Sequence, residues 1–271
     1  MGRNFTSKDY YDFLLYVAVD AALEAGEEII RVRKSANIGT RKKLDKSFVT
    51  DADINANNII TEKLRSTNII VVSEEVIDTG DRFNVESFWL LDPLDGTSEF
   101  VDGGDEYTVN IALIENEKVV LGVVYVPETK ELYFAHKELG SYKYVGDVLK
   151  DAEKDPHNDI VRISTKLPYI ETEKYTIVAS KKNLDEETSF FIELISDGRD
   201  VEYKNRSSSL KFCMIAEGTA DLYPRFYSLA EWDIAAAHAI VKFAGKNVYE
   251  FDGTEVDYNT KYLVAPQFIA K

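Results

Sequence analysis

The sequence predicts a layered fold of mixed class, with an α+β half over residues 1–150 followed by an α/β half over residues 151–271. Two observations predict it. Runs typical of strands, joined by short turns, dominate the first half, whereas strand and helix patterns alternate in the second. The polar, poorly periodic stretch 147–159 separates the two patterns, so we place the domain boundary there.

The first half begins with two helices and two short strands. Apolar residues recur at intervals of three and four over 9–34 and 53–65, which predicts amphipathic helices, and Thr6 is placed to cap the first. Two apolar runs of strand length follow, 69–72 and 88–91, and each ends directly in carboxylates. Three further runs separated by four-residue turns predict antiparallel hairpins, over 107–114, 119–126 and 131–134.

Strands and helices alternate through the second half, as expected for an α/β layer. Gly218 and Gly245 directly follow two of the helical patterns and are placed to end them, because glycine readily adopts the left-handed conformation of a C-cap. The expected strands are 175–179, 201–203, 220–226 and 247–251, and the expected helices are 185–195, 208–216 and 232–243.

The charge of the chain excludes several kinds of partner. Its 271 residues include 48 Asp and Glu against 32 Lys and Arg, a formal net charge of -16. A protein that binds duplex nucleic acid or an anionic membrane needs a basic face, so we expect neither partner. The excess acid either keeps the surface soluble or holds a hard cation, and only the positions of the acids can distinguish these.

Cysteine content and hydropathy indicate the cytoplasm. The single cysteine, Cys213, allows no disulfide within the chain and no cysteine-based zinc or iron–sulfur site. The first residues lack the apolar core of a signal peptide, and no apolar run reaches the roughly 18 to 20 residues of a membrane span. The sequence therefore predicts a cytoplasmic protein without an integral membrane segment.

The most informative stretch is Asp92–Thr97, with the sequence Asp-Pro-Leu-Asp-Gly-Thr. A hydrophobic strand delivers Asp92 to its end, where the following proline prevents a regular helix or ladder. A tight turn then brings the carboxylates of Asp92 and Asp95 and the Leu94 carbonyl towards one point. Such oxygen ligands favour Mg²⁺, and the following glycine and threonine offer backbone N–H groups to an anion. An acidic turn without a ligand is the alternative.

Three other carboxylates lie at comparable places along the chain. Glu74 follows a short apolar run, Asp233 opens an apolar helix, and Asp53 stands three residues after Thr50. Each has an ordinary explanation, namely a solvated strand end, a favourable position in the helix dipole and a capping box. One shared site explains all of them better than unrelated acidic positions do.

A second motif, Arg206–Gly218, has the chemistry of an anion site. Its serines stand at a predicted helix start, where hydroxyl and N–H groups are available. Lys211 lies three residues after Ser208 and rises on the same helix face, and Arg225 adds donors from the end of the next strand. The alternative is a surface helix capped by serine, with a solvated lysine.

The order and spacing of these acidic motifs along the chain resemble those of the lithium-sensitive, magnesium-dependent phosphatases. This superfamily includes inositol monophosphatase and fructose-1,6-bisphosphatase. The matching positions span residues 53 to 233. The resemblance implies a layered αβαβα fold and two or three Mg²⁺ ions per site, with Li⁺ as an inhibitor. The metal ligands that it implies are Glu74, Asp92, the Leu94 carbonyl, Asp95 and Asp233.

The same resemblance assigns roles in catalysis. Thr97, held by Asp53 and aided by Glu74, is expected to orient and deprotonate the attacking water. The N–H groups of Gly96 and Thr97 are expected to hold the phosphate that is cleaved. Homodimers are common in the superfamily, so the resemblance also allows a second copy of the chain as a partner.

The second motif is similar to that of the 3'(2'),5'-bisphosphate nucleotidases, the branch that converts 3'-phosphoadenosine 5'-phosphate to AMP. The resemblance implies that Ser208, Lys211 and Arg225 hold the phosphate that is not cleaved. We therefore expect a Mg²⁺-dependent phosphatase acting on a small phosphate ester. An inositol monophosphatase or another sugar phosphatase is the alternative enzyme, and a non-catalytic nucleotide sensor is the alternative from another class.

Three positions differ from the usual pattern of that branch. Its loop after the metal motif tends to be basic, whereas residues 101–106 are acidic here. Ser207 stands where the branch usually has glycine, and Asp51 adds a carboxylate beside Asp53. These differences leave the metal motif intact and concern how a doubly phosphorylated substrate would be bound.

Overall fold

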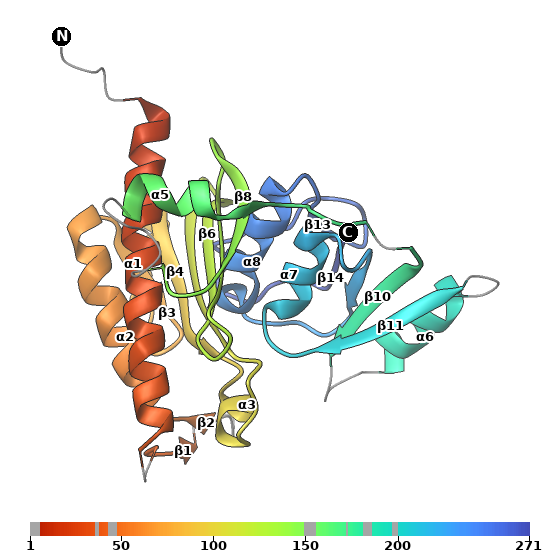
Figure 1. Ribbon diagram of the computed structural model, residues 1–271, viewed down its shortest axis with the longest axis horizontal. Helices are drawn as coiled ribbons and strands as arrows, with labels where there is room; N and C mark the ends of the chain where they lie inside the picture. The colour runs from red at the N-terminus through yellow and green to blue at the C-terminus, as the bar shows by residue number, and fades with distance from the viewer. Residues whose placement is uncertain are drawn as a thin grey trace.

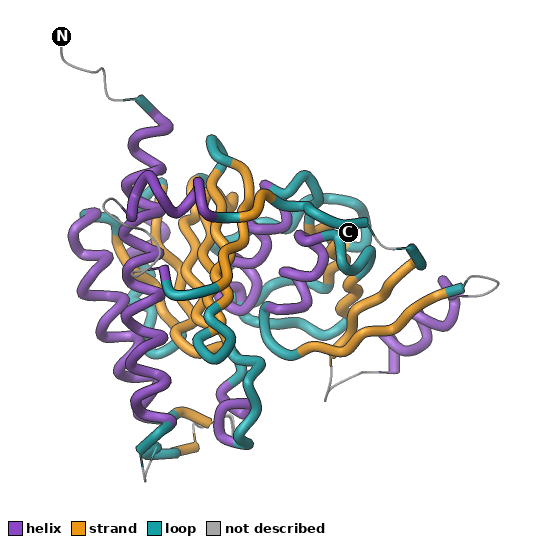
Figure 2. The backbone as a smooth tube through the Cα atoms, in the orientation of Figure 1, coloured by secondary structure: helices purple, strands orange, loops and turns teal. Residues whose placement is uncertain are grey.

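The chain folds into five layers, in the order helix, sheet, helix, sheet, helix. Figure 1 shows the order of the elements, and Figure 2 shows the strands of the large sheet on one side of α7 and α8 and those of the small outer sheets on the other. This αβαβα architecture confirms the predicted fold class. The predicted domain boundary at 150/151 lies outside the described residues. The computed structural model describes residues 6–35, 38–42, 48–148, 156–171, 173–180, 186–196 and 200–271.

The first layer consists of α1 (Ser7–Arg33) and α2 (Asp51–Leu64), which pack against each other and against one face of the large sheet. Both helices begin with a capping box, formed by Thr6 in the first and by Thr50 in the second, as predicted. An antiparallel pair of short strands precedes α2, namely β1 (Arg41–Lys42) and β2 (Phe48–Val49).

The second layer is a sheet with the strand order β3-β4-β5-β6-β7-β8-β9. The β3–β4 pair is parallel and the later pairs are antiparallel, which confirms the predicted hairpins. β8 and β9 were not predicted, because they are short and largely polar and so show little hydrophobic periodicity. The strands are β3 (Ile70–Ser73), β4 (Ser87–Asp95), β5 (Thr108–Glu115), β6 (Lys118–Val126), β7 (Glu131–His136), β8 (Gly140–Val145) and β9 (Thr165–Lys166).

β4 is longer than the predicted run 88–91. Its ladder with β5 continues past the apolar residues, so that Asp92 lies opposite Asn110. A register irregularity between Asp92 and Asp95 accommodates the proline that separates them. The turn predicted to begin at Asp92 therefore begins only after Asp95, and the strand itself carries both carboxylates to the edge of the sheet.

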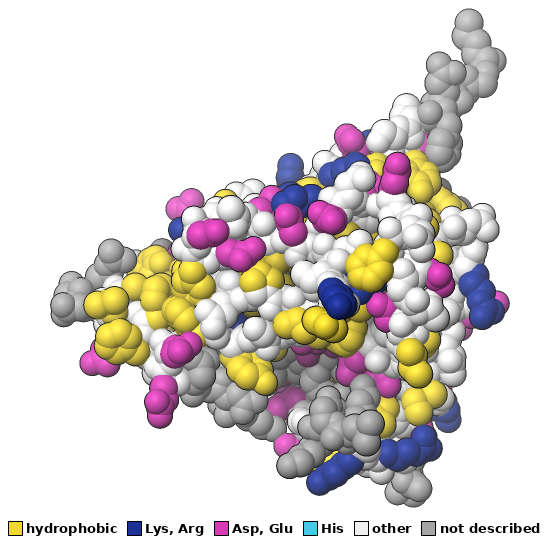
Figure 3. All heavy atoms as spheres, turned by 180° about the vertical axis from the view of Figure 1, so that it is seen from behind, with side chains coloured by type: hydrophobic (Ala, Val, Ile, Leu, Met, Phe, Trp, Pro, Cys, Tyr) yellow, Lys and Arg dark blue, Asp and Glu magenta, His cyan; other side chains and the backbone are white. Residues whose placement is uncertain are grey.

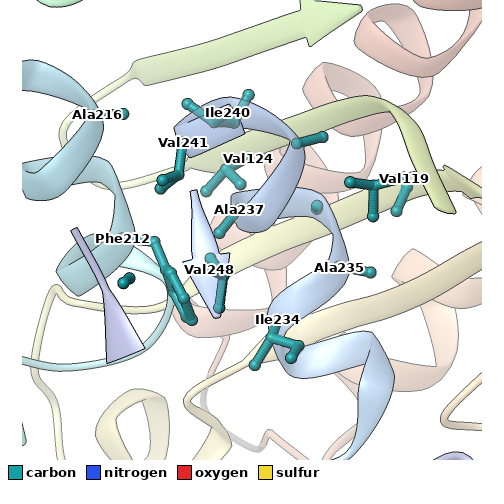
Figure 4. Packing of buried hydrophobic residues seen from close by; sticks show 14 of the residues in the cluster. Val119, Val124, Phe212, Ala216, Ile234, Ala235, Ala237, Ile240, Val241 and Val248 are labelled. Carbon is teal, nitrogen blue, oxygen red and sulfur yellow. The ribbon is translucent and has the colours of Figure 1, made fainter. Parts of the chain in front are cut away.

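The third layer consists of α7 (Leu210–Glu217) and α8 (Glu231–Phe243) on the other face of the sheet. α8 approaches β6 closely because Gly122 has no side chain, and a Cβ there would lie 2.2 Å from a backbone oxygen of α8. Figure 4 shows Ala237 of α8 and Phe212 of α7 on either side of Val248, within one hydrophobic cluster. This packing fixes the start of α8 near the ends of β3 and β4.

Two small sheets and α6 complete the outer layers. β10 and β11 are parallel, and the other sheet has the order β12-β14-β13. The predicted alternation is confirmed, although the strand expected over 220–226 is shorter and β14 was not predicted. Gly218 ends α7 with φ 85°, as predicted. The bounds are α5 (Pro156–Ile163), β10 (Tyr175–Ser180), α6 (Glu186–Ser196), β11 (Val201–Arg206), β12 (Tyr223–Arg225), β13 (Val248–Glu250) and β14 (Phe268–Ala270).

The surface carries acidic side chains in many places. On the face shown in Figure 3 they are scattered among basic and neutral side chains and form no single acidic patch. Of the helices in the described parts of the chain, none is both long enough and apolar enough to cross a membrane.

Candidate active site

The parallel pair β3–β4 brings acidic residues to one edge of the large sheet. Glu74 directly follows β3, and its N–H donates to the Leu91 carbonyl of β4 over 3.2 Å. Asp92 and Asp95 lie at the end of β4, where Asp92 is buried. The charge of Glu74 faces Asp92 and helps burial to raise the pKa of that carboxyl group.

Asp233 reaches the same place from the third layer. It stands in the first turn of α8, where its Oδ2 accepts from the Ala230 N–H over 3.0 Å. This is the capping position that the sequence allowed, but Asp233 also faces the charges of Asp95 and Glu74. We call Glu74, Asp92, Asp95 and Asp233 the site cluster.

Burial raises the pKa values of Asp92, Asp95 and Asp233, and neighbouring carboxylates raise them further. Two nearby cations act in the opposite direction, Lys211 on Asp95 and Arg225 on Asp233. Negative charge is thus concentrated where water screens it poorly. A bound cation would relieve this repulsion.

The site cluster fits a hard divalent cation by donor type and charge. In the described ranges, no three His, Cys, Asp or Glu side chains are already arranged to hold a metal ion. Carboxylate oxygens are instead directed at hydrogen-bond donors. Asp92 Oδ1 accepts from the Leu94 N–H at 3.0 Å, and Asp95 Oδ2 accepts from Ser209 Oγ at 3.3 Å. Because every donor atom of the cluster is a carboxylate oxygen, the chemistry suits Mg²⁺.

The Thr97 hydroxyl lies between this edge of the sheet and α2. Thr97 begins the short helix α3 (Thr97–Val101), and its Oγ is 3.0 Å from Asp53 Oδ1 and 3.2 Å from the Leu94 carbonyl oxygen. The other oxygen of Asp53 accepts from the N–H and the hydroxyl of Thr50, at 2.7 and 2.6 Å. Burial raises the pKa of Asp53, although the bonds from Thr50 and Thr97 oppose the shift. The structure therefore brings Asp53 and Thr97 into direct contact.

Asp51, the additional carboxylate of this segment, points away from the site. Its side chain is 44% exposed and pairs with Arg41 at 3.2 Å. Asp53 is turned inward and buried. Asp51 therefore does not compete with Asp53 for the Thr97 hydroxyl.

Two buried cations lie beside the site cluster. Lys211, in the first turn of α7, donates from Nζ to the Ser208 carbonyl over 2.7 Å. Burial lowers the pKa of Lys211 to about 8, with Asp95 opposing the shift and Arg225 adding to it. Arg225, in β12, is also buried, and its Nε has no hydrogen-bond partner among the described residues. Two adjacent buried cations with a free donor are suited to an anion.

The hydroxyl of Ser208 is already engaged by the backbone. Its Oγ lies 2.8 Å from the Glu106 carbonyl oxygen and 3.1 Å from the Asp95 carbonyl oxygen, so one proton serves two acceptors. The Ser208 hydroxyl therefore stabilises the loop that follows β4 by hydrogen bonding to its backbone.

Three polar side chains that the sequence analysis missed orient the Asp95 carboxylate. Thr108 Oγ and Asn110 Nδ2 each lie 3.4 Å from Asp95 Oδ2, and Ser209 Oγ lies 3.3 Å from it. Asn110 Nδ2 also donates to Ser209 Oγ over 2.9 Å, which joins β5 to the start of α7. The available signal was the polarity of Thr108 and Asn110 within an otherwise apolar strand.

A buried charged network, also missed, holds the start of α8. Glu231 accepts from the N–H groups of Asn259 and Thr260 at 2.7 and 2.8 Å. Arg82 is fully buried and bonds to Asp78, to Asn259 and to the Lys261 carbonyl. The network therefore ties the loop after β3, near Glu74, to the helix that carries Asp233.

Comparisons with known proteins agree with this geometry. Residues 11–270 match the model of the inositol monophosphatase family. Over 244 residues the chain is 36% identical to the 3'(2'),5'-bisphosphate nucleotidase CysQ of Salmonella typhimurium. The aligned region covers 89% of this chain and 92% of that protein.

Solved structures show the same fold. CysQ from Bacteroides thetaiotaomicron, described as a bacterial member of the inositol monophosphatase family, superposes with a TM-score of 0.89 at 38% identity, over 97% of this chain and 98% of that one. The extragenic suppressor protein suhB from Bartonella henselae has a TM-score of 0.73 at 24% identity, over 95% and 93% of the two chains.

Proposed function

Because the chain belongs to the inositol monophosphatase family, we propose that it is a Mg²⁺-dependent phosphatase that removes the 3'-phosphate of 3'-phosphoadenosine 5'-phosphate, giving AMP and phosphate. Similarity to the bisphosphate nucleotidase of Salmonella typhimurium supports this substrate. The observation that carries the proposal is the pair of buried cations beside the site cluster, because a substrate with two phosphates needs a separate place for each.

Phosphatases of this family are generally metal-dependent. We assign the metal to the site cluster, with the Leu94 carbonyl as a further ligand, and expect Mg²⁺ because all these donors are oxygens. Two or three ions per site is the number that the family resemblance implies. Bound ions would supply the positive charge that stabilises a phosphoryl group during transfer. Li⁺ is expected to inhibit by competing for one of the Mg²⁺ positions.

Thr97 and Asp53 handle the attacking water in this proposal. The Thr97 hydroxyl donates towards Asp53 Oδ1, which leaves an oxygen lone pair to accept a hydrogen bond from water. Asp53 is held in place by Thr50, and its raised pKa suits it to receive the proton relayed through Thr97. Glu74 is the second proton acceptor, and the N–H groups of Gly96 and Thr97 hold the scissile phosphate.

Lys211 and Arg225 hold the phosphate that remains on the product. With a pKa of about 8, Lys211 is still mostly protonated at neutral pH. The Nε of Arg225 offers a donor that has no partner among the described residues. Ser208 contributes by fixing Lys211 Nζ through its carbonyl oxygen.

Phosphate release in the presence of Mg²⁺ tests the proposal. We expect the highest kcat/KM with 3'-phosphoadenosine 5'-phosphate, compared with inositol phosphate and fructose bisphosphate. Lys211→Met should raise KM for the bisphosphate nucleotide about tenfold and KM for inositol phosphate by less than about twofold. A preference for inositol phosphate would instead indicate an inositol phosphatase. No release from any substrate, in a folded and metal-loaded sample, would indicate a non-catalytic sensor.

A further inference from the structure

The acidic loop 101–106 is held against the segment before α7 by its last residue, Glu106. The side chain of Glu106 is only 13% exposed. Its Oε2 accepts from the Ser207 N–H over 2.8 Å, and its Oε1 accepts from Arg206 Nη1 over 3.1 Å. Its charge is therefore committed to these two donors.

Glu106 also binds Ser208, through its backbone. The Glu106 carbonyl accepts from Ser208 Oγ over 2.8 Å, so one residue binds two consecutive serines. Ser208 has a φ of 52°, a left-handed conformation that costs energy for a residue with a side chain and persists where contacts enforce it. The positive φ falls on Ser208 and not on Ser207, which explains why serine is tolerated at 207.

Ser208 in turn connects the two parts of the site. It rests directly on the loop after β4, because a Cβ added to Gly96 would lie 2.3 Å from Ser208 Oγ. The same oxygen is 3.1 Å from the Asp95 carbonyl oxygen, and the Ser208 carbonyl accepts from Lys211 Nζ over 2.7 Å. A shift of Ser208 would therefore move Lys211 relative to the site cluster.

We propose that Glu106 is a positioning residue that sets the distance between Lys211 and the site cluster, and thereby selects substrates that carry two phosphate groups. This inference rests on the proposed function. Glu106 acts through its bonds to Ser207 and Ser208. The bond to the Ser207 N–H carries the effect, because it is charge-assisted and shielded. The ion pair to Arg206 contributes little, since Arg206 is 51% exposed.

Substitutions of Glu106 separate positioning from general stability. Glu106→Ala should raise KM for 3'-phosphoadenosine 5'-phosphate about tenfold, while kcat stays within about threefold and KM for adenosine 3'-monophosphate within about twofold. Glu106→Gln should recover most of the loss, because an amide oxygen still accepts from the Ser207 N–H. Arg206→Gln is the matched control and should stay within about twofold of the parent for both substrates.

A KM increase of equal size for both substrates, or a fall in kcat alone, would overturn the inference, because a general structural defect acts on both substrates alike. Glu106→Asp, with a side chain too short to reach Ser207 in the same way, replaces Glu106→Ala where the alanine variant does not fold.

Binding measurements distinguish a failure of the positioning role of Glu106 from a failure of the proposed function. Where the parent releases no phosphate, calorimetry with the same two nucleotides and Mg²⁺ replaces KM. A parent that binds the bisphosphate more tightly but does not cleave it contradicts the proposed function alone, and Glu106→Ala should still lose about tenfold in bisphosphate affinity. A parent that binds both nucleotides equally well, or neither, contradicts the positioning role.

Discussion

Two groups of acids lie at opposite ends of α7 and differ in how their charge is balanced. The site cluster lies at the N-terminal end. At the other end Glu217, the last residue of α7, and Glu131 of β7 each lie 2.6 Å from the Lys143 ammonium. Tyr133 also donates to Glu217 over 2.8 Å. We call Glu131, Lys143 and Glu217 the helix-end cluster.

The pKa of Glu131 in the helix-end cluster is shifted in the opposite direction to the pKa values of Asp92 and Asp233 in the site cluster. Burial raises the pKa of Glu131, but the hydrogen bond and charge of Lys143 outweigh burial, so that the net shift is downward. In the site cluster burial and neighbouring carboxylates together raise the pKa of Asp92 and Asp233. In the helix-end cluster one ammonium lies 2.6 Å from both acids, whereas in the site cluster Lys211 and Arg225 only partly offset the repulsion among four acids, which a cation from solution would relieve further.

The largest expected effect comes from removing a charge from the site cluster. Asp95→Asn should lower kcat at least about 1000-fold, because the proposed metal loses a charged ligand. The fold should persist, since an amide can still accept from Ser209. Phosphate release at saturating Mg²⁺ and circular dichroism measure the two effects. Asp51→Asn, at an exposed carboxylate two residues from Asp53, is the control and should keep parental turnover. Activity of Asp95→Asn within a few-fold of the parent would remove Asp95 from the site.

The positions of the site cluster could be predicted because its members lie at the ends of elements with strong hydrophobic patterns. Glu74 and Asp92 follow or end apolar strands, and Asp233 opens an apolar helix. Strand and helix ends gather at sheet edges in layered α/β folds, so these local patterns favoured one shared site, and the family resemblance supplied the set of ligands. The roles given to them are predictions that Asp95→Asn and Asp92→Asn test.

The supporting contacts could not be predicted, because they join segments far apart in the chain. Glu106 and Ser207 are 101 residues apart, and Tyr133 and Glu217 are 84 apart. The periodicity of β7 shows that one face is covered but does not show that α7 covers it. The helix-end cluster was missed for this reason.

Removing the cation from the helix-end cluster should lower the stability of the fold and leave catalysis unchanged. Lys143→Met leaves the buried Glu217 and the partly exposed Glu131 without a cation, so the free energy of unfolding should fall by about 2 kcal/mol. Urea unfolding measures the change, and kcat at 25 °C should match that of the parent. Lys8→Met, which removes an exposed pair with Asp12, is the control and should change stability by less than about 0.5 kcal/mol. Equal losses in both variants would mean that Lys143 does not balance buried charge.

The smallest expected effect tests the difference between the clusters most directly. Removing a charge should lower the free energy of unfolding in the helix-end cluster and raise it in the metal-free site cluster. Asp92→Asn should raise the free energy of unfolding of the metal-free protein by about 1 kcal/mol, since it removes a buried charge near Glu74, Asp95 and Asp233. The amide oxygen can still accept from the Leu94 N–H, so the local structure should persist. Thermal unfolding in chelator and in Mg²⁺ measures the effect.

In chelator the Asp92→Asn variant should unfold at a higher temperature than the parent, and in Mg²⁺ the order should reverse because only the parent keeps the full set of charged ligands. Asp200→Asn, at an exposed carboxylate paired with Lys174, is the control and should respond to Mg²⁺ as the parent does. A metal-free Asp92→Asn protein that is less stable than the parent would show that the site cluster, like the helix-end cluster, already balances its charge within the fold. Its acids would then contribute to stability without a metal ion, and the contrast between the two ends of α7 would disappear.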